Sequence, residues 1–325
     1  MRVGQLSLSY VARKLGWAAL TLFFVLTVNF FLFRVMPGDP VALLARSQRL
    51  TPEAVAEQKA LYGLDQPMLQ QFLTYLRQTL TGHLGSSLVS GQPVTRVIGA
   101  RVWPTVLLVG SGTALAIIVG VLAGIRAGWF RGTRFDRGSL YGSMLLYSTP
   151  EGWLGMLLLI VFAGSLSWFP SGGLSSGGES GLGSVTDVLS HLALPVATLA
   201  LSYVGQFLIV MRSSMLDVKD EDFVTVGRAV GLPDRLVRRR LVVPNAILPS
   251  FTLIVLSFGF VLGGAIVIET VFSWPGIGQL TYRAIESQDY PVLQAVFLLT
   301  SAAVIVANLV ADIAYGFLDP RIEEV

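Results

Sequence analysis

The sequence lacks cysteine and contains little histidine and little charge. Without cysteine, disulfide frameworks, thiolate metal sites and cysteine nucleophiles are excluded. The only two histidines, His83 and His191, stand too far apart to suggest a metal cluster, so we predict no metal ligands. Charged residues make up 13% of the 325 residues, whereas a soluble protein carries about 25%. With 53% hydrophobic residues and a mean hydropathy of +0.67, the chain is predicted to be an all-α integral membrane protein.

The sequence also lacks the signatures of an ATP-binding or hydrolytic enzyme. None of the three lysines, Lys14, Lys59 and Lys219, follows a glycine as a Walker A loop requires. No HExxH zinc helix occurs. We therefore predict no catalytic residues and no cofactor bound by this chain. The small net charge of +3 also makes nucleic acid an unexpected partner.

Six apolar stretches are long enough to cross a bilayer, which needs about 20 residues. They are residues 15–33, 102–125, 139–166, 192–211, 247–271 and 292–317. Of the 23 lysines and arginines, 15 fall at the N-terminus, in the second-to-third and fourth-to-fifth loops, or near the C-terminus. Positive residues favour the cytoplasmic side. Both termini are therefore predicted to be cytoplasmic.

These spans predict three regions. Residues 1–35 hold the cytoplasmic N-terminus and first span, 36–101 a structured extracytoplasmic segment, and 102–325 the core with five spans. Within the outer segment, Thr51-Pro52 and Gly63 have the residue types that begin and end a helix. A second short helix is expected from Pro67 to Leu80. The glycine- and serine-rich stretch 171–184 is predicted to be a flexible outer loop.

Glycines recur at four-residue spacing in two spans: at Gly120, Gly124 and Gly128, and at Gly259 and Gly263. Small residues at this spacing allow close helix approach in lipid. The spacing predicts either packing within this chain or packing against a second membrane subunit.

One ionisable residue, Glu151, lies deep in a predicted span, about 18 Å from its start at 1.5 Å per residue. It either lines a polar pathway or supports a helix broken at Pro150. Arg34, Glu269 and Asp312 lie nearer the ends of spans, where a structural role is expected.

The cytoplasmic segment 216–249 is too long for a simple turn between spans. Acidic residues crowd its beginning, a short helix 223–230 is expected after them, and Gly231 and Pro233 end that helix. A basic run, 235–240, then leads back to the membrane. A compact helix with Gly227, Ala229 and Gly231 would let the groove of another protein close around it, as a docking helix requires.

The segments 222–232 and 245–249 resemble the cytoplasmic coupling motif of ABC-importer permeases, above all the dipeptide/oligopeptide group. Further resemblance to this family covers nearly the whole chain. It lies in residues 36–40, 62–67, 82–87, 269–278 and 318–321. The stretch 269–278 makes this ordered set strongly specific. Thr225-Val226-Gly227 departs from the usual Glu-Ala-Ala pattern, Val230 replaces a frequent Lys, and Pro244 replaces a basic residue.

The resemblance implies a permease fold of the type I ABC-importer class and a coupling loop at about 216–246. It implies a second homologous permease subunit, two cytoplasmic ATPase subunits that bind ATP and magnesium, an extracytoplasmic substrate-binding protein and membrane lipid as partners. The ATPase-coupling residues that it implies are Asp222, Phe223, Thr225, Gly227, Arg228, Ala229, Gly231 and Leu232.

The implied function is formation of the translocation pathway for di- and oligopeptides in an ATP-driven importer of a prokaryotic inner or plasma membrane. The same architecture also serves nickel or glutathione in related permeases. A different class, a gradient-driven secondary transporter, would require Glu151 to titrate. A membrane enzyme would require clustered catalytic groups, which the sequence does not show.

Overall fold

The computed structural model describes residues 8–35, 66–177 and 182–318. The chain forms two compact units, one of Met1–Trp103 with Gly276–Val325 and one of Pro104–Pro275, and their boundary falls inside one long helix. We call them the terminal unit and the central unit. The helix expected from Thr51 to Gly63 lies outside the described residues.

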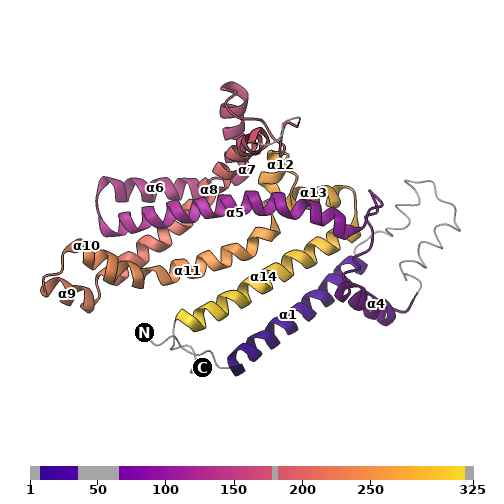
Figure 1. The fold of residues 1–325 in the computed structure, drawn as a ribbon, viewed down its shortest axis with the longest axis horizontal. Helices are drawn as coiled ribbons and strands as arrows, with labels where there is room; N and C mark the ends of the chain where they lie inside the picture. The colour runs from indigo at the N-terminus through magenta and orange to yellow at the C-terminus, as the bar shows by residue number, and fades with distance from the viewer. Residues whose placement is uncertain (1–7, 36–65, 178–181, 319–325) are drawn as a thin grey trace. The chain divides into compact units, whose positions relative to one another are not determined.

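Helices make up most of both units (Figure 1). The α-helices are α1 (Leu8–Val35), α4 (Met68–Leu80), α5 (Val94–Trp129), α6 (Arg134–Ser148), α7 (Glu151–Leu158), α8 (Leu182–Lys219), α9 (Asp222–Ala229), α10 (Asp234–Leu236), α11 (Val243–Phe260), α12 (Ile266–Val271), α13 (Ile277–Glu286) and α14 (Tyr290–Leu318). π-helical stretches follow α7 at Leu159–Ser165 and α10 at Val237–Val242, and a 3₁₀ turn, Val261–Gly263, follows α11.

Five of the described helical segments are long and apolar enough to cross a membrane, and α6 with the helix that follows it forms a bent pair. Counted as one span, that pair brings the number to six. The prediction of an all-α membrane protein with six spans is therefore confirmed.

The third predicted span, residues 139–166, is broken rather than continuous. The two halves, Arg134–Ser148 and Glu151–Ser165, meet at an angle of 101°. Pro150 lacks a backbone N–H, and the residue before a proline avoids the helical region. Thr149 accordingly has an extended ψ of 126°. The proline therefore turns the chain instead of being absorbed into one helix.

The predicted end of the fifth span at Val271 is wrong. The helix α11 stops at Phe260, and α12 begins separately at Ile266. Gly264 has a φ of +72°, in the left-handed region that side chains other than glycine rarely adopt. The Gly263-Gly264 pair thus ends the span, although the apolar sequence continues into α12.

In the terminal unit, α1 and α14 run side by side (Figure 1). At one end Lys14 Nζ lies 2.9 Å from an Asp312 carboxylate oxygen. Further along, Asn29 Nδ2 donates to the carbonyl oxygen of Gln294 at 3.0 Å. The structural role expected for Asp312 is thus visible as an ion pair between the first and last helices.

The helix predicted from Pro67 to Leu80 is confirmed as α4. It packs on α1 through Phe72 and Tyr75, whose rings lie 5.2 and 5.6 Å from the ring of Phe30. Burial raises the pKa of the Tyr75 phenol, so this group stays protonated at neutral pH. The described start of the region after the first span is therefore packed against that span.

In the central unit, the glycines of α5 allow α8 to approach its backbone. A β-carbon on Gly124 would lie 2.7 Å from Cβ of Met211, and one on Gly128 would lie 2.5 Å from Cβ of Met215. The first alternative drawn from the glycine spacing, packing within this chain, is confirmed for α5. Gly263 has nothing within 4 Å of such a carbon.

The loop predicted to be flexible at residues 171–184 is packed at its beginning. The N–H of Gly173 donates to the carbonyl oxygen of Phe272 at 2.9 Å, and a β-carbon on Gly172 would collide with the same carbonyl. The helix α8 already begins at Leu182. The prediction of a flexible loop is therefore wrong at both ends of that stretch.

Candidate functional site

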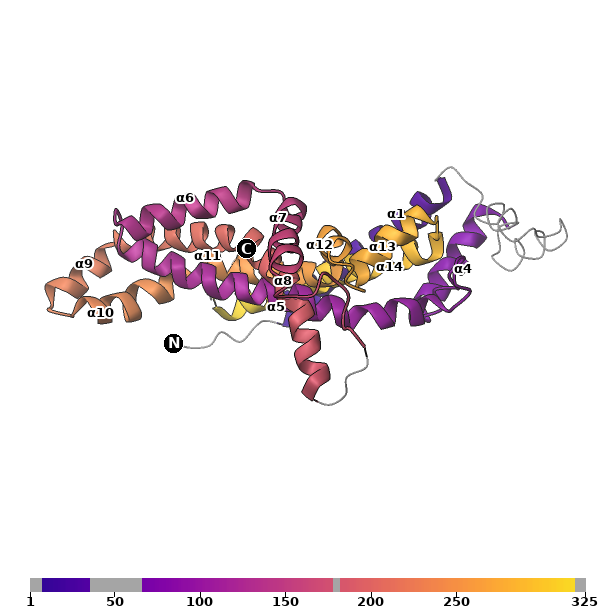
Figure 2. The ribbon, with the colours of Figure 1, turned by 90° about the horizontal axis from the view of Figure 1, so that it is seen from above.

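The helix α9 and the turn after it lie at the end of the central unit opposite α12 (Figure 2). Gly231 has a φ of +84°. The N–H of Gly231 donates to Arg228 and that of Leu232 to Gly227, at 3.0 and 3.2 Å. This pair of bonds is a Schellman motif, which satisfies the last carbonyls of a helix. The short helix predicted in this segment is therefore present, and it ends at the glycine that the sequence indicated.

One face of α9 is fixed to the central unit. Val224 is fully buried in a cluster that holds Trp129, Met211, Met215, Val237, Val242 and Ala246. A β-carbon on Gly227 would lie 2.6 Å from Cδ1 of Leu241. Gly227 is therefore small because α9 packs closely on its own chain. The predicted reason, room for the groove of another protein, is wrong at this residue.

The exposed surface of α9 and of the turn that follows it carries four apolar side chains. The exposed fractions are 41% for Phe223, 59% for Val226, 72% for Val230 and 39% for Leu232. Val226 and Val230 were absent from the predicted coupling residues. Their spacing from Val224 could have identified them, because residues two and six positions away point to the other side of a helix. We call these four residues the outer face of α9.

The remaining predicted coupling residues, Asp222, Thr225, Arg228, Ala229 and Gly231, are also exposed. Arg228 Nε lies 3.6 Å from a carboxylate oxygen of Asp234, which steadies the turn after α9. The structure thus brings all the predicted residues onto one short segment, with Gly227 alone turned inward.

The end of α5 holds α9 through an aromatic ring. The charged groups of Lys219, Arg228 and Arg238 lie 5.3, 5.9 and 5.7 Å from the centre of the Trp129 indole. A cation within about 6 Å of such a ring is attracted by its negative face. Lys219 Nζ also donates to the Trp129 carbonyl oxygen at 2.9 Å.

A second contact near this end joins the α5–α6 turn to α8. Arg212 donates to both carboxylate oxygens of Asp136, at 2.6 and 3.1 Å. The N–H of Gly132 donates to the same carboxylate at 2.8 Å. A bidentate pair of this kind fixes orientation as well as charge. In the sequence, Arg212 and the arginines around Asp136 indicate the orientation of the chain in the membrane, and they do not indicate this pairing.

Glu151, the candidate pathway residue, lies in the first turn of α7 at the break in the third span. Its side chain is half-buried. It interacts electrostatically with the Tyr203 phenol on α8. Carboxylates are favourable at helix N-termini. This position suits local support of the broken helix, and it leaves a pathway role open to experiment.

Glu269, by contrast, is fully buried. Thr105 donates to its Oε1 at 3.0 Å, and Trp274 Nε1 donates to the carbonyl oxygen of Pro104 at 2.9 Å. The stretch 269–278 thus ties α12 and the turn after it to α5. The structural role expected for Glu269 agrees with this geometry.

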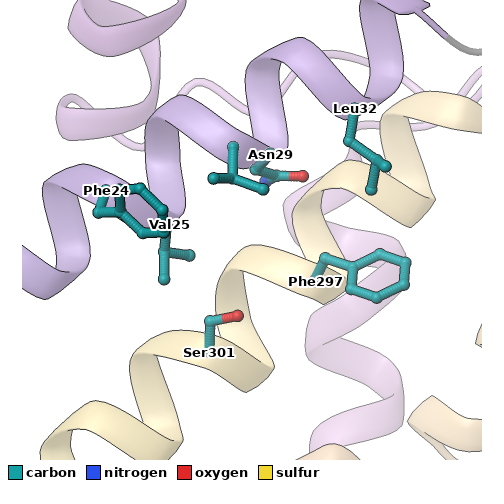
Figure 3. A pocket seen from close by; sticks show the side chains of 7 residues that line it. Phe24, Val25, Asn29, Leu32, Phe297 and Ser301 are labelled. Atoms are coloured by element: carbon teal, nitrogen blue, oxygen red, sulfur yellow. The ribbon is translucent and has the colours of Figure 1, made fainter.

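A groove of about 180 Å³ lies between α1 and α14 in the terminal unit. Figure 3 shows Asn29 among its apolar lining residues, which are Phe24, Val25, Val28, Leu32 and Phe297, with Ser301 below them. This lining offers few groups that could recognise a polar solute. Across the residues that the structure describes, no group of three His, Cys, Asp or Glu side chains could hold a metal ion.

Comparison with known proteins gives a consistent result over the whole chain. Residues 116–324 match the family described as "Binding-protein-dependent transport system inner membrane component". Residues 7–108 match the model of the N-terminal part of such membrane components.

Individual relatives match this chain over nearly the full length of both proteins. A permease protein of Brucella suis is 38% identical over 296 residues, which cover 90% of this chain and 92% of the relative. The di/tripeptide transport system permease protein DppB of Pseudomonas aeruginosa is 36% identical, with 97% and 98% covered. The glutathione transport system permease protein GsiC of Escherichia coli is 38% identical, with 97% and 99% covered.

Proposed function

Because the chain belongs to the family of inner membrane components of binding-protein-dependent transport systems, we propose that it is the non-catalytic permease subunit of an ATP-driven peptide importer. It forms the translocation pathway together with a second homologous permease. Two cytoplasmic ATPase subunits bind ATP and magnesium, and an extracytoplasmic binding protein delivers di- and oligopeptides. This chain itself binds no cofactor in the proposed assembly.

The outer face of α9 is the observation that carries this proposal. Four apolar side chains are exposed on α9 and the turn after it, and Val224 and Gly227 fix this helix to the ends of α5, α8 and α11. An exposed apolar patch marks a surface that another molecule covers. A helix with one anchored face and one free apolar face suits an ATPase subunit that must both bind the permease and move it.

The proposed mechanism follows from this attachment. ATP binding closes the two ATPase subunits and displaces the α9 segments that they hold. Since α9 is packed on the ends of the membrane helices, its displacement shifts α5, α8 and α11 and switches the pathway from inward to outward access. ATP hydrolysis then allows the inward-facing arrangement to return.

The proposed substrates are short peptides, with glutathione as the second candidate. Both relatives with a named substrate handle small peptides or a peptide-like molecule, since glutathione is itself a tripeptide. Uptake of labelled trialanine and of labelled glutathione, each challenged with an excess of the other unlabelled compound, distinguishes the two. The preferred substrate is the one that suppresses uptake of the other and is not itself suppressed.

Co-purification of the ATPase subunits tests the proposal directly. Val226→Asp and Val230→Asp should place charge in the apolar contact and detach the ATPases while the chain remains in the membrane. Val89→Asp is the matched control, because Val89 is 64% exposed and Val226 is 59% exposed. Retention of the ATPases by both α9 variants would contradict the assignment of this surface.

The proposed orientation has both termini and α9 in the cytoplasm. Because the chain contains no cysteine, a single Ser176→Cys variant can be labelled without background. A membrane-impermeant maleimide should label it in intact spheroplasts. Labelling only after the membrane is opened would reverse the orientation.

A further inference from the structure

Trp129 is the last residue of α5, and its side chain is only 9% exposed. Its indole belongs to the cluster that receives Val224 of α9. The proposed function requires a displacement of α9 to reach the membrane helices, and Trp129 stands where these elements meet.

Cations from three different elements surround this ring. Lys219 ends α8, Arg228 lies in α9, and Arg238 lies in the π-helical stretch before α11. Lys219 also donates to the Trp129 carbonyl oxygen and Arg228 also pairs with Asp234, and the indole adds an attraction that all three cations share. The negative face of the indole supplies this attraction. Trp129 therefore links α9 to the ends of α5, α8 and the segment before α11.

The helix that carries Trp129 is closely joined to α8. A β-carbon on Gly128 would lie 3.0 Å from the Arg212 carbonyl oxygen, and one on Gly124 would lie 2.8 Å from the Leu208 carbonyl oxygen. Backbones in such contact have little freedom to slide independently, because close-packed groups transmit strain. A force applied at Trp129 should therefore move α5 and α8 as a pair.

We propose that Trp129 is the positioning residue that transmits the displacement of α9 to the α5–α8 pair. This inference rests on the proposed function, in which ATPase subunits hold the outer face of α9. It assigns to Trp129 a role in coupling rather than in binding the ATPases, because the ring contacts the inner side of α9.

The test compares Trp129→Leu with Trp129→Phe in the complete transporter, reconstituted with its ATPase subunits and binding protein. Leucine and phenylalanine are both apolar and both smaller than tryptophan, but only phenylalanine keeps a π face. We expect Trp129→Leu to retain the ATPases and their basal hydrolysis. Its trialanine uptake per ATP hydrolysed should fall about tenfold, which corresponds to about 1.4 kcal/mol. Trp129→Phe should stay within about threefold of wild type, because cation–π attraction is weaker for Phe but not lost.

Two further variants sharpen the result. Trp17→Leu is the matched control, since Trp17 is 62% exposed on α1 in the terminal unit, and it should leave coupling unchanged. Arg228→Gln should lower coupling in the wild-type background but add little to Trp129→Leu, because contacting residues are not additive.

Wild-type coupling in Trp129→Leu would overturn the inference. So would loss of the ATPase subunits from that variant, since Trp129 would then only shape the docking surface. Failure of the proposed function would look different, because the wild-type chain itself would then neither retain ATPase subunits nor show ATP-dependent uptake.

Discussion

Two short helices of the central unit, α9 and α12, are both attached to α5 but in different ways. The α12 segment is held by buried polar bonds, with Glu269 and Trp274 fully shielded. The α9 segment is held by one buried valine, one closely packed glycine and cations around an indole. The first attachment fixes a segment within the core. The second holds a helix firmly while leaving an apolar face for another molecule.

The comparison also separates family identity from function. The stretch 269–278 is the most specific part of the family resemblance, yet its side chains contribute to packing inside the chain. The less specific segment 222–232 presents the surface on which a partner can act. The predictions that follow should therefore show large losses of stability at the α12 attachment, and losses of transport with little loss of stability at α9.

The largest effect on stability is expected for Trp274→Ala. This substitution removes a fully buried indole and its hydrogen bond to Pro104, and large aromatic truncations in a core cost about 3–5 kcal/mol. Trp153→Ala is the matched control, since Trp153 is 54% exposed. Thermal unfolding of the purified proteins in detergent measures the difference. Equal unfolding temperatures for the two variants would contradict the buried attachment of α12.

A smaller loss is expected for Gly128→Ala. Its new β-carbon would lie 2.5 Å from Cβ of Met215, and overpacking of this kind costs about 1–3 kcal/mol. Gly142→Ala is the control, because no atom lies within 4 Å of a β-carbon there. The same unfolding measurement applies. A loss of stability as large in Gly142→Ala would mean that close packing of α5 on α8 does not determine the result.

At Gly231 a modest loss of stability should accompany a complete loss of transport. The residue has a φ of +84° and open space around a β-carbon, so a side chain meets backbone strain of about 1–2 kcal/mol but no clash within the chain. Gly231→Trp should remain inserted yet lose ATP-dependent uptake, because the indole would stand between α9 and the ATPase. Gly231→Asn, which tolerates this conformation, should retain most uptake. Normal uptake by Gly231→Trp would remove Gly231 from the docking surface.

Much of the fold could be predicted from the sequence because lipid imposes a simple pattern. The six spans, the α4 helix and the short α9 helix followed from apolar length and from the residues that begin and end helices. A break at Pro150 was one of the alternatives that the sequence left open, but its angle of 101° and the early end of α11 could not be predicted, since the apolar sequence continues past Phe260. The backbone preferences at Pro150 and Gly264 determine where the two helices break, and a count of apolar residues does not include such preferences.

The candidate site was predicted less completely than the fold. The segment was located, but the residues chosen were those that match a motif rather than those that face outward. Val226 and Val230 depart from the motif and are exposed, while Gly227 matches it and is buried. Trp129 and Asp136 lie about 90 residues before α9 in the sequence, and only tertiary packing brings Trp129 against it. Long-range contacts of this kind have no local sequence signal.

The smallest effect is expected for Glu151→Gln, which tests whether a charge inside the central unit takes part in transport. Glu151 lies in the first turn of α7 and interacts with the Tyr203 phenol. A glutamine keeps the size of the side chain and removes its charge. Uptake driven by ATP should therefore fall at most several-fold, with the preference for trialanine over glutathione unchanged.

If Glu151 instead carried protons, the amide would abolish accumulation, because it cannot cycle a proton. Uptake into vesicles with ATP supplied and the proton gradient collapsed separates these cases. Persistence of uptake supports an ATP-driven importer, and its loss would establish the gradient-driven alternative.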